Sequence, residues 1–238
     1  MRFDLASFTD PGGRGSNEER VVLIDHRTLI AGIVADGAGE HGGGDIAAQL
    51  VVDTVSDVLR DCATRGTSVE TEQLADAMLA ANRAIVDAQC SGGARSRMRS
   101  TIAILTIDPL TKLANWAHCG DTRIYCFREG RIALQTSDHR AAPHSIEANR
   151  RAALGTEGAL EVEAARAPFP IEEGDVFLAC CHGFCARLDE ASLIDTIGEA
   201  RDAASWLAAL AAHARRAVSA DAEPLSAIAV WAGSPRAM

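Results

Sequence analysis

The chain has 238 residues, of which 47% are hydrophobic and only 4% aromatic, so it is long enough to bury a sizeable core. Its 33 acidic and 23 basic residues give a formal net charge of −10, which argues against a nucleic-acid surface and against an anionic membrane as partners. The acidic balance fits a site of carboxylates that bind cations, but many soluble proteins are equally acidic.

Targeting and redox signals are few. No apolar run approaches the roughly 18–20 residues of a transmembrane helix, and the N-terminal stretch lacks the apolar core of a signal peptide. The seven cysteines are odd in number and scattered, which is not the pattern of a disulfide framework. We therefore expect a protein of the reducing cytoplasm.

The first part of the chain changes from a strand-like to a helix-like pattern. Three short runs rich in Val and Ile predict strands at 3–8, 20–26 and 29–35. A helical face then runs from Asp45 to just before Gly66. The letters TSVE (67–70) predict a capping box that opens a second long helix, which ends at SGG.

The second part returns to strands. Glu129-Gly130 is expected to be the hairpin turn between two of them, and the polar, arginine-rich segment 138–166 a long excursion. Strands are expected at 101–108, 113–120, 123–127, 131–136, 175–181 and 226–232, and a helix around 202–218. Strands that bracket helix pairs, without a strict βαβ alternation, indicate an α+β layered fold. With no repeat and no linker, we expect residues 1–238 to form one domain.

The stretch LIAGIVADGAGEHGGGDIAAQL (29–50) holds the clearest candidate site. An apolar strand ends at Asp36-Gly37, and glycines follow at 39, 42, 43 and 44. A carboxylate at the end of a strand is held rigidly, and glycines expose backbone carbonyls and amides, so the stretch suits a hard cation or a phosphate. A tight strand-to-helix turn capped by Asp36 explains this stretch alone equally well.

Three other stretches also place polar groups beside predicted strands. GRGSNEERVV carries Arg14 and Glu18 just ahead of a strand, and AHCGDTRIY carries Asp121 in a tight turn. LACCHGFCARLD is an apolar strand that ends at His182-Gly183. Together with the stretch around Asp36, they suggest a site assembled from several strand ends.

With these stretches, the sequence resembles the metal-dependent serine/threonine protein phosphatases of type 2C, the PPM family, over almost its whole length. The family's Arg-x-x-Asn-Glu-Asp stands here as RGSNEE, and its Asp-Gly-x-Gly-Gly-His-x-Gly-Gly as DGAGEHGGG. MRSTIAIL, HCGDTRIYCFREGRI with the following TSDHR, and ALGTEG are similar to further family motifs in the same order. Five motifs in family order are a strong signal, although each alone is weak.

The resemblance implies a four-layer α-β-β-α sandwich, two antiparallel sheets flanked by helix pairs, with metals in a cleft at one edge. Asp36 would bridge two divalent cations, Mn²⁺ or Mg²⁺, while the Gly37 carbonyl and Glu18 would hold one of them. A hydroxide activated by the metals would hydrolyse phosphoserine or phosphothreonine in a phosphorylated protein substrate. Arg14 would bind the phosphate. Asp121 would assist a third metal, and a turn-forming role for Asp121 is the alternative.

This sequence departs from the family at one side of the expected site. The family's first metal has two further Asp ligands, and here His182 stands at one of these positions. The other falls on Glu223, or on Asp221 if the loop is displaced. Imidazole is a poor ligand for Mg²⁺ but is accepted by Mn²⁺, Fe²⁺ and Zn²⁺. We expect this metal position to bind Mg²⁺ weakly, to prefer a transition metal, or to be empty.

Two interpretations of function remain open, and the enzyme is favoured. The first is a working phosphatase with an altered metal preference. The second is a catalytically weak or inactive phosphatase-like domain that binds a phosphoprotein or partner as a regulator. A third class, a carboxylate-rich cation-binding or structural domain, is disfavoured by Arg14 and Asp36 in family order. The oligomeric state is not predicted.

The remaining histidines and cysteines are interpreted structurally. Cys180 and Cys181 are expected to be buried core residues and not zinc ligands. His118 is expected in the core or in a hydrogen bond, whereas His139 and His144 are expected to be solvated.

Overall fold

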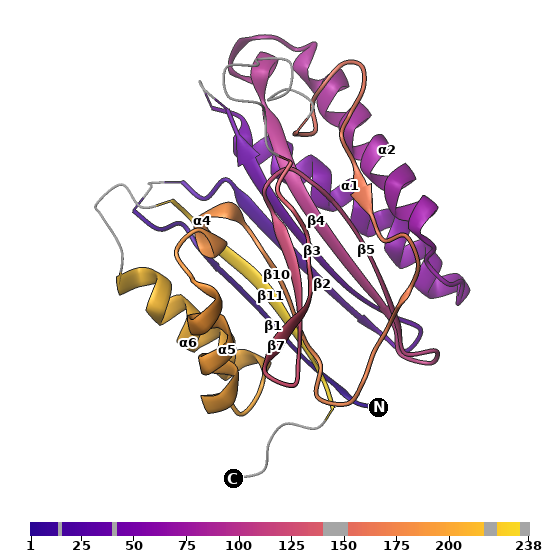
Figure 1. The fold of residues 1–238 in the computed structure, drawn as a ribbon. Helices are drawn as coiled ribbons and strands as arrows, with labels where there is room; N and C mark the ends of the chain where they lie inside the picture. The colour runs from indigo at the N-terminus through magenta and orange to yellow at the C-terminus, as the bar shows by residue number, and fades with distance from the viewer. Residues whose placement is uncertain (14–15, 40–41, 140–151, 217–222, 234–238) are drawn as a thin grey trace.

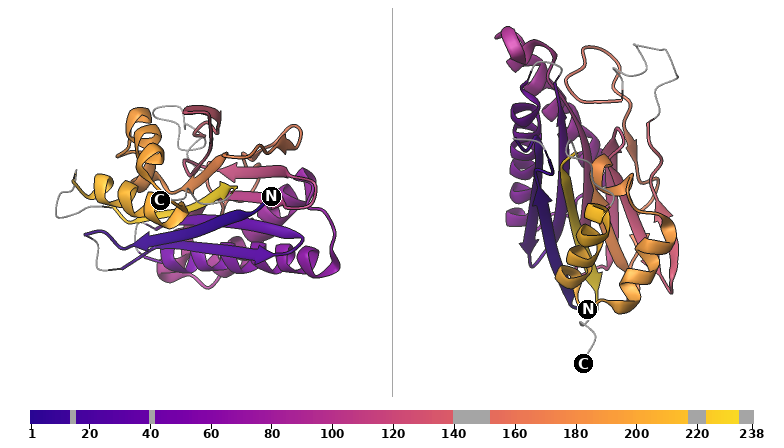
Figure 2. Two further views of the ribbon diagram at one scale, coloured as in Figure 1. Left: turned by 90° about the horizontal axis from the view of Figure 1, so that it is seen from below. Right: turned by 90° about the vertical axis from the view of Figure 1, so that its left-hand side faces the viewer.

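Two antiparallel β-sheets lie face to face, and a pair of helices covers the outer face of each (Figure 1). This computed structural model describes residues 1–13, 16–39, 42–139, 152–216 and 223–233. Figure 2 (right) shows the layers edge-on, with one helix pair on each side of the sheets. The predicted α+β sandwich of four layers is therefore confirmed.

The six-stranded sheet is built mainly from the first half of the chain. Its order is β2-β3-β4-β5-β8, with β9 also pairing β5. Its strands are β2 (Glu19–His26), β3 (Leu29–Ala38), β4 (Arg99–Asp108), β5 (Leu113–Cys119), β8 (Glu163–Ala164) and β9 (Phe169–Pro170). Helices α1 (Gly44–Arg65) and α2 (Thr71–Gln89) cover it, and the short 3₁₀ helix η1 (Gly93–Arg97) leads into β4. Because β3 and β4 are covered on both faces, they are apolar almost throughout.

The five-stranded sheet joins the two ends of the described chain. Its order is β1-β11-β10-β6-β7, so β11 lies between β1 and β10. Its strands are β1 (Phe3–Asp10), β6 (Arg123–Arg128), β7 (Arg131–Gln135), β10 (Val176–Cys180) and β11 (Leu225–Ala232). A one-turn helix, α4 (His182–Cys185), follows β10, and helices α5 (Glu190–Glu199) and α6 (Ala203–Arg216) cover the sheet.

Trp206 anchors the second helix pair to its sheet. Its ring is fully buried and packs edge-on against Phe127 of β6, with ring centroids 5.6 Å apart. Its indole N–H donates a 3.0 Å hydrogen bond to the Thr196 hydroxyl of α5. One large side chain therefore joins α6, α5 and the sheet, and its buried polar atom has a partner.

The helix boundaries correct one sequence prediction. The capping box of α2 is formed by Glu70 and Gln73, one turn later than the predicted TSVE. The hydroxyl and the amide of Thr67 both donate to the Cys62 carbonyl, so Thr67 completes the C-terminus of α1 beyond Gly66. A side chain that satisfies one helix end cannot also cap the start of the next.

The connections show one confirmed turn and one partial correction. Glu129 and Gly130 both have positive φ, 51° and 74°, as the predicted two-residue hairpin requires. Residues 140–151 of the predicted excursion lie outside the described residues. The described remainder returns to the six-stranded sheet. There Leu154 forms a β-bridge with Ser100, and strand β8 pairs with β5.

Within the described ranges, none of the helices combines the length and the apolar character needed to cross a membrane.

The predicted site residues fall where several strands end together. In the six-stranded sheet, Asp36 at the end of β3 lies opposite Glu19 at the start of β2. In the five-stranded sheet, Cys180 at the end of β10 lies opposite Arg123 at the start of β6 and Ala227 near the start of β11. We call this end of the sandwich, with α4 and the start of α1, the site edge.

Candidate active site

Asp36, Gly37 and Glu18 meet at the start of α1. The Gly37 amide donates a 3.1 Å hydrogen bond to the Glu18 carbonyl. A Cβ on Gly37 would lie only 1.9 Å from the Gly44 carbonyl oxygen, and one on Gly44 would lie 2.9 Å from both the Glu18 Cδ and the Gly37 carbonyl carbon. The Glu18 carboxyl and the Gly37 peptide group therefore pack over Gly44 at a distance that no larger residue allows. We call these residues the glycine half of the site.

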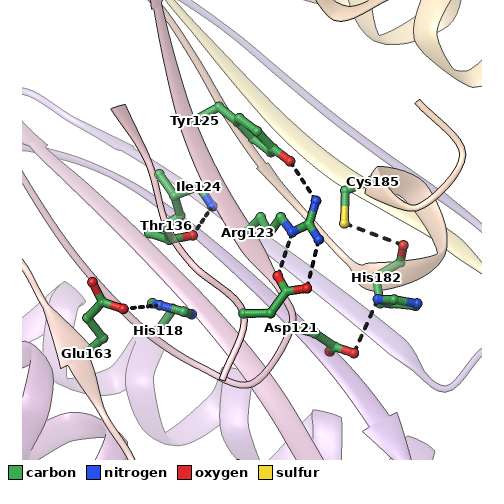
Figure 3. Close-up of polar contacts among 10 residues, drawn as sticks. His118, Asp121, Arg123, Ile124, Tyr125, Thr136, Glu163, His182 and Cys185 are labelled. Carbon is green, nitrogen blue, oxygen red and sulfur yellow. Dashed lines mark hydrogen bonds and ion pairs between the residues drawn. The ribbon is translucent and has the colours of Figure 1, made fainter. Parts of the chain in front are cut away.

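His182, Asp121 and Glu223 meet beside α4. His182 Nδ1 lies 3.2 Å from Asp121 Oδ2, and both side chains are partly open to solvent (Figure 3). A Cβ on Gly183 would lie 3.1 Å from the Glu223 Cβ and 3.6 Å from its Oε2, which places Glu223 against the first turn of α4. The five-stranded sheet thus supplies an imidazole and two carboxylates, which we call the histidine half.

Cys181 connects the two halves. It is completely buried and directly precedes His182. Burial raises the pKa of its thiol well above the usual value, and the negative charges of Glu19 and Asp36 raise it further. Glu19 and Asp36 belong to the other sheet, so the carboxylates of the six-stranded sheet act electrostatically on the residue that precedes α4.

In the histidine half, the pKa of the Asp121 carboxyl is raised above its usual value. Burial raises its pKa, the charges of Asp138 and Glu223 raise it further, and the charge of His182 opposes them. A cation nearby would relieve this repulsion, since an opposite charge favours the ionised carboxylate.

These residues fit a pair of divalent cations. The glycine half offers carboxylate and carbonyl oxygens, the donors that Mg²⁺ and Mn²⁺ prefer, and the absence of a Cβ at Gly37 and Gly44 lets these groups approach one another closely. The histidine half adds an imidazole, which Mn²⁺, Fe²⁺ and Zn²⁺ accept. An oxygen-rich site with one imidazole, at the edge of an α-β-β-α sandwich, has the donor set that a metal-dependent hydrolase needs.

Several predicted positions cannot be placed. Arg14, His41, His144 and Asp221 lie outside the described residues. The described structure does not test the ligand roles of Glu18, Asp36, Gly37, His182, Glu223 and Asp121, which it brings to one edge.

His139 corrects a sequence prediction. It was expected to be solvated, but only 5% of its side chain is exposed, and its ring centroid lies 4.5 Å from that of His118, with the ring planes tilted by 37°. The reason is that residues 136–139 pack back against the Gly120 turn, where His139 and Gly120 exchange backbone and side-chain hydrogen bonds. The buried positions predicted for His118, Cys180 and Cys181 are confirmed.

Sequence reasoning assigned no role to Arg123 and Asp138. Arg123 Nε and Nη2 donate to the two carboxylate oxygens of Asp138 at 2.6 and 2.7 Å. Its Nη1 contacts the Tyr125 hydroxyl at 3.2 Å (Figure 3). The pair ties the end of the segment after β7 to the start of β6, beside Asp121. Both residues lie in quoted motifs, GDTR and SDH, and this was the signal that could have found them.

The comparisons with known proteins show the family of the chain. A profile of the protein phosphatase 2C family matches residues 20–221. The serine/threonine phosphatase Stp of Listeria innocua is 26% identical over 209 residues, which cover 81% of this chain and 78% of the relative.

Solved structures share the fold over nearly the whole chain. PppA, a key regulatory component of T6SS in Pseudomonas aeruginosa, is 25% identical with a TM-score of 0.75, covering 98% of each chain. The catalytic domain of the serine/threonine phosphatase PstP in complex with two manganese ions is 22% identical with a TM-score of 0.75, covering 96% of this chain and 97% of the other. The chain belongs to the protein phosphatase 2C family, as its motifs predicted.

Proposed function

We propose that the site edge hydrolyses phosphoserine and phosphothreonine in phosphorylated proteins with the help of two divalent cations, Mn²⁺ or Mg²⁺. The observation that carries this proposal is the glycine half, where Glu18 and the Gly37 peptide group pack over Gly44 beside Asp36. The names of the relatives and the two manganese ions of the PstP complex support the same activity.

The glycine half would hold the cations through oxygen. The backbone of Asp36 is fixed by its place near the end of a strand paired on both sides, so less freedom would be lost when its carboxylate binds the ions. The Gly37 carbonyl and Glu18 complete the oxygen donors. Bound ions would lower the pKa of a coordinated water and neutralise charge on the phosphate oxygens.

The histidine half would favour a transition metal. A carboxylate on one imidazole nitrogen orients the ring and leaves the other nitrogen for a metal. Asp121 Oδ2, 3.2 Å from His182 Nδ1, is near enough to take this role. His182 Nε2 would be the ligand atom, Asp121 would act as the positioning residue, and Glu223 would add an oxygen. We therefore expect Mn²⁺ to support turnover better than Mg²⁺.

Arg14 would bind the phosphate of the substrate. A guanidinium can donate two parallel hydrogen bonds to two phosphate oxygens, which fixes the phosphoryl group in one orientation. This role rests on the RGSNEE motif.

The cysteines support a cytoplasmic location within this proposal. All seven are free thiols, and six of them are buried. Free thiols persist in a reducing compartment.

The test is a metal add-back assay on a phosphothreonine peptide. The full chain is stripped of metal, and Mg²⁺, Mn²⁺, Fe²⁺ or Zn²⁺ is returned in turn. Turnover with Mn²⁺ should fall about 10³-fold in Asp36→Asn, the equivalent of roughly 4 kcal/mol of transition-state stabilisation. Asp25→Asn is the matched control, since Asp25 is exposed on β2 of the same hairpin, far from Asp36 along the strand.

A flat result with every metal would contradict the proposal. The catalytically inactive, phosphoprotein-binding alternative would then be favoured, although none of the comparisons supports it. Equal turnover in the wild type and Asp36→Asn would assign the activity to a contaminant.

A further inference from the structure

A second cluster of metal-ligand residues lies beside the active-site residues and is separate from them. His118 of β5, His139 after β7 and Glu163 of β8 each place one ligand atom so that all three atoms lie within 4.8 Å of one another. Glu163 Oε2 is 3.2 Å from His118 Nε2 and 3.8 Å from His139 Nε2. In Figure 3, His118 and Glu163 form a group of their own, apart from His182 and Asp121.

The burial of this cluster is typical of a built site. The His118 side chain is fully buried and that of His139 is 5% exposed, while the Glu163 side chain is 46% exposed. Within the described residues, His118 Nδ1 and His139 Nε2 are buried and have no hydrogen-bond partner. The two imidazoles thus form the buried side of the cluster, and Glu163 forms its solvent-exposed side.

The His118 ring is held in the form that binds metals. Burial is the main cause that lowers its pKa, while Glu163 and Asp138 act in the opposite direction. A neutral imidazole is the ligating form, so a metal would not need to displace a proton from a charged His118.

We propose that His118, His139 and Glu163 bind one transition-metal ion, Zn²⁺ above all, with a fourth position open to water. Two histidines and one glutamate form a recognised zinc donor set. With Zn–N distances of about 2.0–2.1 Å, tetrahedral ligand atoms lie roughly 3.3 Å apart. The two separations from Glu163, 3.2 and 3.8 Å, lie close to this value, and the third, between the two imidazoles, is at most 4.8 Å and would contract on binding.

Binding carries an identifiable cost at both histidines. His118 Nε2 faces the Glu163 carboxylate, which can only accept, so a metal on this atom would have to replace its proton. His139 carries a similar cost. The Gly120 amide donates a 3.2 Å hydrogen bond to His139 Nδ1, which places the ring proton on Nε2 in the metal-free protein. A metal on Nε2 requires this proton to move to Nδ1, and the bond to Gly120 must open. The affinity is therefore lower than in a preformed site, and the backbone at Gly120, the residue before Asp121, responds to the metal.

The bound ion would join three segments that are distant in sequence. His118 lies on β5, His139 ends the described segment after β7, and Glu163 opposes His118 in the register of β8 with β5. The site would thus fix the return of the chain to the six-stranded sheet next to the candidate active site.

The test separates this cluster from the active site. In the full-length double variant Asp36→Asn, His182→Asn, calorimetric titration should still find one Zn²⁺ per chain, and Co²⁺ should give the intense visible absorption of a tetrahedral ion. Adding Glu163→Gln should weaken Zn²⁺ binding at least about 10-fold, since loss of even an outer-shell partner has that effect. Glu161→Gln, an exposed carboxylate on the same segment, should change nothing.

A second readout follows the tautomer change. Zn²⁺ should shift the NMR resonance of the Gly120 amide in the double variant, and this shift should be absent once Glu163→Gln is added. Zn²⁺ binding that disappears in the double variant, or that Glu163→Gln leaves unchanged, would overturn the proposal. The cluster would then be a hydrogen-bonded His–Glu–His group only.

Discussion

The two halves of the candidate active site are built in different ways. The glycine half is made of backbone as much as of side chains, because a Cβ on Gly37 or Gly44 would enter space that another group already fills. The histidine half is made of side chains on a one-turn helix and a neighbouring turn, and both His182 and Asp121 are partly open to solvent.

This difference determines which groups of the site can be replaced by another residue type without moving the backbone. A side-chain ligand at the end of β10 can be exchanged while the strand and α4 stay in place, since only the atoms beyond Cβ change. The Gly37 peptide group cannot be exchanged in this way. The changes in ligand type relative to the family's motifs accordingly fall in the histidine half, whereas DGAGEHGGG keeps the motif's Asp36, Gly37, Gly39 and Gly43.

The strongest way to break this comparison is Gly37→Ala. The new Cβ would lie 1.9 Å from the Gly44 carbonyl and 2.7 Å from the Glu18 carbonyl, both backbone atoms that cannot rotate away. We expect loss of metal-dependent turnover and destabilisation above the ~3 kcal/mol usual for overpacking. Urea unfolding and the phosphopeptide assay measure the two effects. Gly32→Ala on the same strand is the control, because there the Cβ would meet only the Ile228 side chain, at 3.1 Å.

Gly183→Ala applies the same change to the histidine half. Its Cβ would lie 2.4 Å from the Pro224 carbonyl oxygen, so a smaller loss of about 1–3 kcal/mol is expected. Gly198→Ala in α5 meets nothing within 4 Å and serves as the helical control. A loss for Gly183→Ala equal to that for Gly37→Ala would refute the view that the histidine half is the more adaptable one.

His182→Asp sharpens the comparison through metal preference. An added carboxylate should raise the affinity for Mg²⁺ about 10-fold, or roughly 1.4 kcal/mol, and reduce the advantage of Mn²⁺. The ratio of Mg²⁺- to Mn²⁺-supported turnover is the measurement. An unchanged ratio would mean that His182 does not contact the metals.

The smallest expected effect concerns an ion pair that joins the end of β1 to α6. Asp10, at the end of β1 opposite Leu225, pairs with Arg215 of α6. The hydrogen bond from Arg215 is the main cause that lowers the pKa of Asp10, and the Gly12 amide contributes. Because both side chains are partly exposed, Asp10→Asn should cost less than about 1 kcal/mol near neutral pH.

The sign of the pH dependence follows from this lowered pKa. The contribution of Asp10 to stability is present above its usual value of 3.8 and is lost as the pH falls through the lower folded-state pKa. The stability difference between the wild type and Asp10→Asn should therefore shrink below about pH 4. A difference that stays constant down to pH 2 would rule out the ion pair as its source.

Long, strongly patterned elements could be predicted from the sequence, and short ones could not. The apolar runs of β3 and β4 are long enough to indicate buried strands. The apolar faces of α1 and α2 repeat with a helical period over many residues, so only a helix fits them. Helix α5 was missed because its ten residues include Gly198 and several β-branched residues, so its helical character comes from packing beside α6.

The site was predictable in composition and not in geometry. Motifs named the residues of both halves, but the contact between His182 and Asp121 joins the start of α4 to a turn between two other strands. Nothing in either stretch indicates that distance. The burial of His139 likewise depends on its long-range bonds to Gly120, which local polarity does not show.

The position of β11 has a consequence for the synthesis of the chain. Strand β11 separates β1 from β10, so residues 3–10 leave the ribosome long before their neighbour at 225–232 exists. The contiguous segment from β2 to β5, with α1 and α2, can assemble in the meantime. The glycine half is therefore expected to form on the nascent chain before the histidine half. A chain that stops before residue 225 would leave β1 and β10 without the strand between them, and unpaired edges of this kind favour aggregation.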